Sequence, residues 1–158
     1  MEILELINSG SRRLQNKNIC SHRLDSEILL SKVLNKTREE LLISLEQTIE
    51  PQKIINFHRL IDRRSSKEPI AYILEKKEFW SKSFLVSKNT LVPRPETELM
   101  VEKIVQVFKK KDIFLLDIGT GTGCILLSIL SELKNSKGIG IDISSKAIQT
   151  ASANSKKY

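Results

Sequence analysis

Leu-Asp-Ile-Gly-Thr-Gly-Thr-Gly, at residues 116–123, is the segment from which the architecture of this chain can be inferred. It begins at the end of a continuous apolar run over 113–116, which is typical of a strand buried on both faces of a parallel sheet. Apolar runs predict a helix at about 124–133 and a second strand at 138–142, and another helix begins near Ser145. The order strand, helix, strand, helix predicts the beginning of an open parallel α/β sheet.

The glycine-rich segment is the candidate ligand site. In open α/β sheets ligands bind beyond the carboxyl ends of the strands, and glycines there let the backbone turn sharply and approach the ligand. A nicotinamide-binding loop would have its third glycine at position 124, where this chain has cysteine, and a phosphate-binding loop would end in Gly-Lys-Ser or Gly-Lys-Thr. The chain instead has Gly-x-Gly-x-Gly with an acid two positions before the first glycine, the pattern of S-adenosylmethionine sites. A carboxylate there repels a diphosphate but suits a cofactor that carries a cationic amino group and a sulfonium.

We therefore predict S-adenosyl-L-methionine as the cofactor. A second acid, Asp142, ends the second strand about 20 residues after the loop and can accept hydrogen bonds from both ribose hydroxyls of an adenosine. The alternative, a glycine-rich turn that binds no ligand, accounts less well for three glycines combined with two acids and two strands. The candidate cofactor-binding residues are Asp117, Gly119, Thr120, Gly121, Thr122, Gly123 and Asp142.

Upstream of this region the chain divides into a helical part and a β part. Apolar residues at helical spacing, a capping-box pattern at 37–40 and Pro51 at the first turn of a helix predict a small helical bundle over residues 1–66. Residues 67–95 contain prolines and two β-prone runs, which predict a β-hairpin linker that turns around Ser81 and Lys82. Residues 96–158, which open with a helix, form the third part, the start of the α/β domain.

Composition narrows the functional class. The formal net charge is +7, but the lysines are scattered and no aromatic residues interleave with them, so direct nucleic-acid binding is not expected. Two distant cysteines give no disulfide framework, which fits a reducing cytoplasm. We predict no metal site, because His22 and His58 lack partners at metal-ligand spacing. We also predict no signal peptide and no membrane span, because the N-terminus is acidic and the apolar runs are short.

A more specific pattern occurs at residues 91–98, Leu-Val-Pro-Arg-Pro-Glu-Thr-Glu. This segment resembles the signature of the HemK-type (PrmC) release-factor glutamine methyltransferases. Residues 23–30, 68–74 and 78–80 agree with the same family in the same order, so the resemblance covers nearly the whole chain. Small departures occur at Glu75 and Ser81, where the family usually has glycine.

The resemblance implies a helical domain that helps to hold the substrate, followed by a class I (Rossmann-like) methyltransferase domain. It implies methylation of the side-chain amide of the glutamine in the Gly-Gly-Gln motif of peptide-chain release factors, and hence a cytoplasmic enzyme of translation termination. We expect a monomer whose partner is the release factor. By the same match residues 119–123 bind the methionine end of the cofactor, Asp142 binds its ribose, and Arg94 and Glu96 lie beside the active site.

The family's catalytic Asn-Pro-Pro-Tyr motif does not occur in this sequence, so no catalytic residue is predicted. We expect a truncated form that holds only the first βαβα part of the sheet and is inactive alone. Two other functions stay open. One is a release-factor-binding module without catalysis. The other is a methyltransferase that acts on nucleic acid, which the basic charge allows and the signature at 91–98 argues against.

Overall fold

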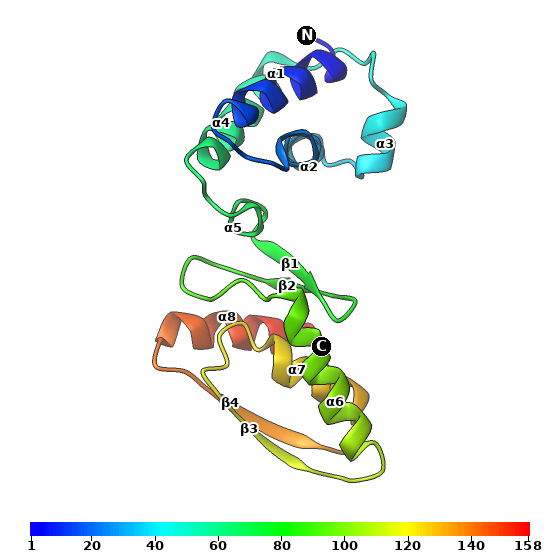
Figure 1. The fold of residues 1–158 in the computed structure, drawn as a ribbon, viewed down its shortest axis with the longest axis vertical. Coiled ribbons are helices and arrows are strands. Elements are labelled where there is room, and N and C mark those ends of the chain that lie inside the picture. The colour runs from blue at the N-terminus through cyan, green and yellow to red at the C-terminus, as the bar shows by residue number, and fades with distance from the viewer. The chain divides into compact units, whose positions relative to one another are not determined.

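The computed structural model describes residues 1–158 and divides them into two compact units, Met1–Leu74 and Glu75–Tyr158. Figure 1 shows the helical first unit in blue to green and the second unit, which contains all four strands, in green to red. No helix of either unit has both the length and the apolar character needed to cross a lipid bilayer.

The first unit consists of five helices: α1 (Ile3–Gln15), α2 (His22–Leu34), α3 (Arg38–Ile43), α4 (Pro51–Ser65) and α5 (Ile70–Leu74). Pro51 is the first residue of α4, a position at which its missing N–H costs no hydrogen bond. The predicted capping box is present. Thr37 Oγ1 accepts a hydrogen bond from the backbone N–H of Glu40 (3.1 Å), and Glu40 Oε2 accepts one from the backbone N–H of Thr37 (2.7 Å).

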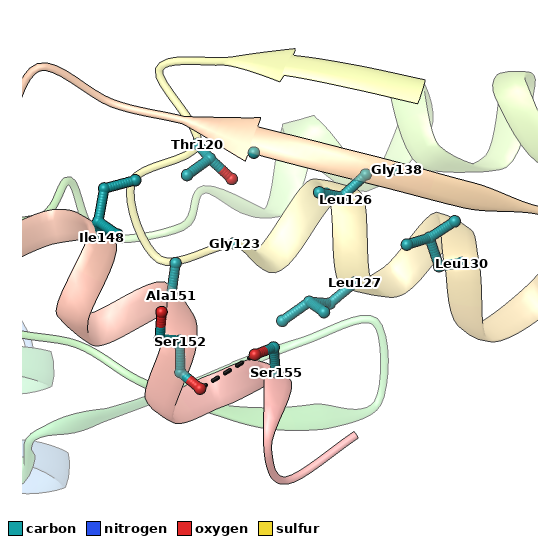
Figure 2. Close-up of a pocket in the computed structure, with 11 residues that line it drawn as sticks. Thr120, Gly123, Leu126, Leu127, Leu130, Gly138, Ile148, Ala151, Ser152 and Ser155 are labelled. Carbon is teal, nitrogen blue, oxygen red and sulfur yellow. Dashed lines mark hydrogen bonds between the residues drawn. The ribbon is translucent and has the colours of Figure 1, made fainter. Parts of the chain in front are cut away.

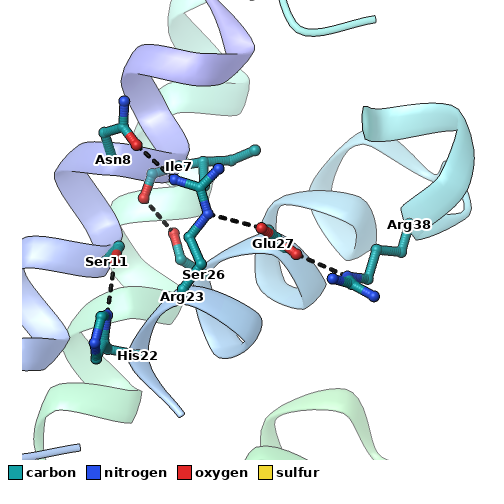
Figure 3. Close-up of polar contacts among 8 residues, drawn as sticks. All are labelled: Ile7, Asn8, Ser11, His22, Arg23, Ser26, Glu27 and Arg38. Atoms are coloured by element: carbon teal, nitrogen blue, oxygen red, sulfur yellow. Dashed lines mark hydrogen bonds and ion pairs between the residues drawn. The ribbon is translucent and has the colours of Figure 1, made fainter. Parts of the chain in front are cut away.

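A hydrophobic core joins these helices, and small residues let α1 and α2 approach closely. A Cβ added to Gly10 would lie 2.6 Å from Ser26 Oγ and 2.7 Å from Phe57 Cζ, so no larger residue fits. The fully buried Ser26 donates from Oγ to the carbonyl of Ile7 (2.9 Å), which satisfies its hydroxyl (Figure 3). The fully buried apolar side chains include Ile3, Leu6, Ile7, Leu14, Leu29, Leu30, Leu41, Phe57 and Ile61.

Two buried acidic residues of α2 form ion pairs with arginines inside the bundle. Glu27, whose side chain is 5% exposed, accepts from Arg23 Nε and Arg38 Nε, both at 2.7 Å (Figure 3). Burial raises the pKa of Glu27, but the two guanidinium groups outweigh it, and the pKa lies below its ordinary value. Asp25 accepts from Arg64 Nε at 2.6 Å, which ties α2 to α4. These charged residues of the family-like stretch therefore stabilise the bundle.

The second unit begins with an antiparallel hairpin of β1 (Lys76–Phe79) and β2 (Lys82–Leu85). Its two turn residues are Trp80 and Ser81, with φ angles of 51° and 52°, as in a type I′ turn. The turn thus lies one residue before the position predicted from the sequence.

Tertiary contacts explain this shift. The backbone N–H of Trp80 donates to Glu98 Oε1 (2.9 Å), and its indole Nε1 donates to Glu132 Oε1 (2.8 Å). Both acceptors are distant in sequence, and together they hold a tryptophan in a left-handed conformation that local propensity disfavours.

The rest of the second unit is η1 (Pro95–Thr97), α6 (Glu98–Phe108), β3 (Phe114–Ile118), α7 (Cys124–Glu132), β4 (Lys137–Ile141) and α8 (Ser145–Ser155). Strands β3 and β4 pair in parallel, with Asp117 opposite Gly140. Figure 1 shows α6, α7 and α8 on the same side of this sheet. The element order confirms the predicted βαβα part of a Rossmann-like sheet.

The expectation that β3 is buried on both faces is wrong. Its alternate side chains are exposed, and so are those of β4 on the same face, because the helices of this unit cover only the other face. The exposed apolar face consists of Phe114, Leu116, Ile118, Ile139 and Ile141, which are 45% to 75% exposed.

The two units differ from the three-part division made at residues 66 and 95. Residues 67–74 lie in the first unit, where α5 contacts α2 and α4. The hairpin lies in the second unit, where Phe79 and Phe84 belong to the same hydrophobic cluster as Val101 and Ile129. The hairpin is therefore an integral part of the α/β unit.

Candidate functional site

The glycine-rich loop joins the end of β3 to the start of α7 and has a backbone that requires glycine. Gly119, Gly121 and Gly123 have φ angles of 82°, 55° and 77°, in the left-handed region that a Cβ disfavours. The N–H groups of Gly119 and Thr120 both donate to the carbonyl of Ile141, at 2.8 and 2.9 Å. The loop is therefore fixed at the carboxyl end of β4 as well as that of β3.

Side chains predicted for the cofactor site also order this loop. Thr120 Oγ1 donates to Asp117 Oδ2 (2.7 Å), so the acid at the end of β3 closes over the first turn of the loop. The hydroxyl of Thr122 accepts from the backbone N–H of Cys124 (3.3 Å) at the start of α7. Thr120 and Thr122 are buried, whereas Asp117 is partly exposed.

Asp142 lies directly against the loop, as expected from its place at the end of β4. Its Oδ2 accepts from the N–H of Gly121 and its Oδ1 from the N–H of Ser144, both at 2.9 Å. These two backbone donors hold the pKa of Asp142 below its ordinary value, so the carboxylate is ionised at neutral pH. Each oxygen keeps a further lone pair with which it can accept a ligand hydroxyl.

The close approach of β4 to the loop depends on two further glycines. A Cβ added to Gly140 would lie 2.7 Å from Thr120 Oγ1 and 3.0 Å from Thr120 Cβ. One added to Gly138 would lie 2.6 Å from Leu126 Cδ1 and 3.1 Å from the carbonyl of Leu115. The first glycine makes room for the loop, and the second makes room for α7.

The outer side of the loop is open. A Cβ added to Gly119 would meet no atom within 4 Å, and one added to Gly121 would meet only the carbonyl of Gly119 at 3.9 Å. Accessible backbone between two carboxylates fits a ligand with a cationic group at one end and hydroxyls at the other. The acceptor oxygens of Asp117 and Asp142 therefore fit S-adenosylmethionine and do not suit a diphosphate.

The inner side of the loop borders a separate cavity of about 320 Å³ (Figure 2). Figure 2 shows it between α7 and α8 beneath β4, with Leu126, Leu127 and Ile148 pointing into it. Neither Asp117 nor Asp142 lines this cavity, although Thr120 and Gly123 do. The cavity is therefore distinct from the surface that the two acids border.

The signature at 91–98 has no direct bond to the glycine-rich loop through its two candidate residues. Arg94 and Glu96 are exposed on and beside η1, and their side chains make no hydrogen bond or ion pair with the loop. Glu98 of the same segment has a structural role, because its carboxylate accepts a hydrogen bond from the backbone N–H of Trp80 in the hairpin turn. Sequence reasoning missed this role because only the fold brings 80 and 98 together.

Asn154 is a second residue that the sequence did not single out. It is fully buried on α8, and its amide bonds to the hairpin and to the loop. An asparagine within an otherwise small-residue helix, Ala-Ser-Ala-Asn-Ser, was the available signal. Cys124, after the loop, is buried, and burial raises the pKa of its thiol, so it is a packing residue.

Models of known domain families match residues from both units of the chain. The model of the PrmC N-terminal domain matches residues 5–74, and that of a methyltransferase domain matches residues 109–158. The first match ends at the boundary between the two units.

Individual relatives match nearly the whole chain. A release factor glutamine methyltransferase of Buchnera aphidicola subsp. Baizongia pistaciae is 41% identical over 157 residues, which cover 99% of this chain and 56% of the relative. One of Aliivibrio fischeri is 38% identical over 156 residues, covering 99% of this chain and 55% of the relative. A bifunctional methyltransferase of Rickettsia prowazekii is 36% identical over 175 residues, covering 99% of this chain and 34% of the relative.

The chain thus spans about a third to somewhat over half the length of these relatives. The resemblance predicted from residues 91–98 and the glycine-rich loop is confirmed by the two domain matches and by these identities. The chain is therefore similar to release factor glutamine methyltransferases, with a first unit that matches the PrmC N-terminal domain and a second unit that matches a methyltransferase domain.

Proposed function

We propose that this chain forms the substrate-recognition bundle and the cofactor loop of an enzyme that methylates peptide-chain release factors. The methyl donor is S-adenosyl-L-methionine, and the acceptor is the side-chain amide nitrogen of the glutamine in the Gly-Gly-Gln motif. The enzyme acts as a cytoplasmic monomer. The observation that carries the proposal is the pairing of Asp142 with the N–H of Gly121, which puts an ionised carboxylate beside an open glycine-rich loop.

Each candidate residue has a distinct task in this proposal. Asp117 attracts the cationic amino group of the methionine end, and the backbone of residues 119–123 accommodates it. Thr120 and Thr122 keep the loop in its bound shape through their bonds to Asp117 and Cys124. Asp142 accepts from the ribose hydroxyls with the lone pairs that Gly121 and Ser144 leave free. Arg94 and Glu96 lie at the edge of the substrate site.

The chemistry explains why such positioning matters. The bound cofactor supplies an electrophilic methyl group on its sulfonium. An amide nitrogen is a weak nucleophile, because its lone pair is delocalised into the carbonyl. Holding the methyl donor and the amide in line therefore provides most of the rate acceleration. The residues described here hold the donor, and no catalytic group is assigned among them.

Calorimetric titration with S-adenosylhomocysteine tests the cofactor site. We expect the wild-type chain to bind and Asp142→Ala to bind at least about tenfold more weakly, because charge-assisted acceptors are lost. Asp112→Asn, which alters an exposed acid at the far end of β3, is the matched control and leaves the affinity unchanged. No binding by wild type, or equal binding by Asp142→Ala, would overturn the proposal.

Retention of a release factor on the immobilised chain tests the substrate. We expect the immobilised chain to retain the release factor in the absence of cofactor. If charged residues contribute to this binding, high salt should dissociate the complex. Retention together with failed calorimetry would favour the non-catalytic binding module. Salt-sensitive binding of RNA without retention of the release factor would favour a methyltransferase acting on nucleic acid.

A further inference from the structure

Asn154 is the polar side chain most completely engaged in the second unit. It lies on α8 and is fully buried. Its Oδ1 accepts from the backbone N–H of Leu85 (2.7 Å), and its Nδ2 donates to the carbonyls of Leu85 (3.0 Å) and Thr122 (2.9 Å). One amide thus joins the hairpin strand β2, the glycine-rich loop and α8.

Only an amide of this size meets these three partners. Leu85 presents one donor and one acceptor, and Thr122 presents an acceptor, so the side chain must accept once and donate twice. An aspartate supplies acceptors only, and a leucine of similar shape supplies neither. Because the site is buried, water cannot replace the lost partners, and each orphaned backbone group destabilises its segment.

Strand β2 is also held by two residues that follow α8, Lys157 and Tyr158. The carbonyl of Ser83 accepts from Lys157 Nζ (2.6 Å) and from the hydroxyl of Tyr158 (2.9 Å). The rings of Phe84 and Tyr158 lie 5.3 Å apart. The hairpin therefore forms two of the three hydrogen bonds of Asn154, and the glycine-rich loop forms the third.

The bond to Thr122 falls where the loop is most constrained. The next residue, Gly123, has a φ angle of 77° and begins the capping of α7. Orientation of the peptide between residues 122 and 123 therefore sets the direction of the N–H groups that open the helix. Anchoring that carbonyl fixes the shape of the ligand-facing backbone without any contact with the ligand.

We propose that Asn154 is a positioning residue that couples the β-hairpin to the cofactor loop, so that a disturbance of β2 changes cofactor affinity. This inference rests on the proposed function for its second consequence but not for its first. The first consequence is structural: loop and hairpin lose order together when the amide is removed. The second is functional: cofactor binding weakens although no cofactor contact has changed.

Amide hydrogen exchange of the full chain, measured by NMR, tests the structural consequence. Asn154→Leu should speed exchange at Leu85, Gly123 and Cys124 by about tenfold or more, while amides in the middle of α7 change little. Asn154→Asp keeps the acceptor for the Leu85 N–H, so exchange should rise more at Gly123 than at Leu85. Asn135→Asp makes the same chemical change at an exposed position and should leave all these rates unaltered.

Unchanged loop exchange in both variants would overturn the coupling. An equal acceleration of every amide of the second unit would overturn it too, because that result means only global destabilisation. Titration of the same proteins with S-adenosylhomocysteine then tests the functional consequence, for which we expect at least a tenfold weaker affinity in Asn154→Asp. If wild type itself does not bind, the proposed function fails while the exchange result still decides the coupling.

Discussion

Replacement of Gly140 by alanine should separate the packing of the sheet from the shape of the cofactor loop. The added Cβ would lie 2.7 Å from Thr120 Oγ1, 3.0 Å from its Cβ and 3.1 Å from its Cγ2. Thr120 is β-branched and buried, so it cannot rotate away without releasing its bond to Asp117. The loop must therefore shift.

The size of the effect follows from two opposing terms. Overpacking a filled site costs about 1–3 kcal/mol, and replacing a strand glycine by alanine returns about 0.5–1 kcal/mol of backbone entropy. We expect a net loss of about 1–2 kcal/mol in the free energy of unfolding. For a unit of this size that lowers the melting temperature by roughly 5–15 °C.

Gly138→Ala provides the matched control. Its Cβ would also be too close to neighbours, Leu126 Cδ1 at 2.6 Å and the Leu115 carbonyl at 3.1 Å, but none of them belongs to the loop. Thermal melts followed by circular dichroism should show comparable losses for the two variants. Titration with S-adenosylhomocysteine should show weakened binding only for Gly140→Ala. Equal affinities of the two variants would refute the assignment of this loop as the binding surface.

Three further predictions concern the rest of the chain. Glu27→Ala should lower the free energy of unfolding of the first unit by about 2–3 kcal/mol, since two charge-assisted bonds to half-exposed arginines are lost. Because the pKa of Glu27 is lowered in the folded state, this contribution is complete above its ordinary value of 4.5 and disappears as the pH falls through the folded pKa. Urea titrations at pH 7 and pH 3 measure it, and an equal difference at both would contradict it. Iodoacetamide at pH 8 should alkylate the exposed Cys20 at least tenfold faster than Cys124, whose buried thiol has a raised pKa; mass spectrometry that finds equal rates would argue against the burial. The exposed apolar face should bind the dye ANS, and Leu116→Lys with Ile139→Lys should reduce its fluorescence; undiminished fluorescence would place the dye elsewhere.

Local chemistry explains why many elements were predictable. The capping box at 37–40 and Pro51 fix the starts of α3 and α4 through bonds within a single helical turn. Likewise, left-handed backbone at Gly119, Gly121 and Gly123 is a property of glycine itself, so the loop could be recognised without coordinates. The place of Asp142 follows too, because neighbouring parallel strands bring their carboxyl ends to one edge.

Other features depend on residues far apart in the chain. The turn at Trp80 is set by Glu98 and Glu132, which override the local preference of an aromatic residue for a strand. The hairpin's membership of the second unit follows from its packing with Val101. Which face of β3 is covered cannot be derived from its apolar run, since the run is the same whether helices lie on one face or both.

The sequence by itself determined the helical bundle, the parallel βαβα order, the glycine-rich loop with its two acids, and the resemblance to release factor glutamine methyltransferases. Each depends on residue type, on spacing within a few positions, or on a short signature. Only the tertiary structure decided that Asn154 connects the loop to β2, and that the helices of the second unit cover one face of the sheet and not the other. The physical reason is that a buried hydrogen bond or an apolar contact forms only when two segments of the folded chain come together. The partners of Asn154 lie 32 and 69 residues away, so no local sequence pattern indicates that they are in contact.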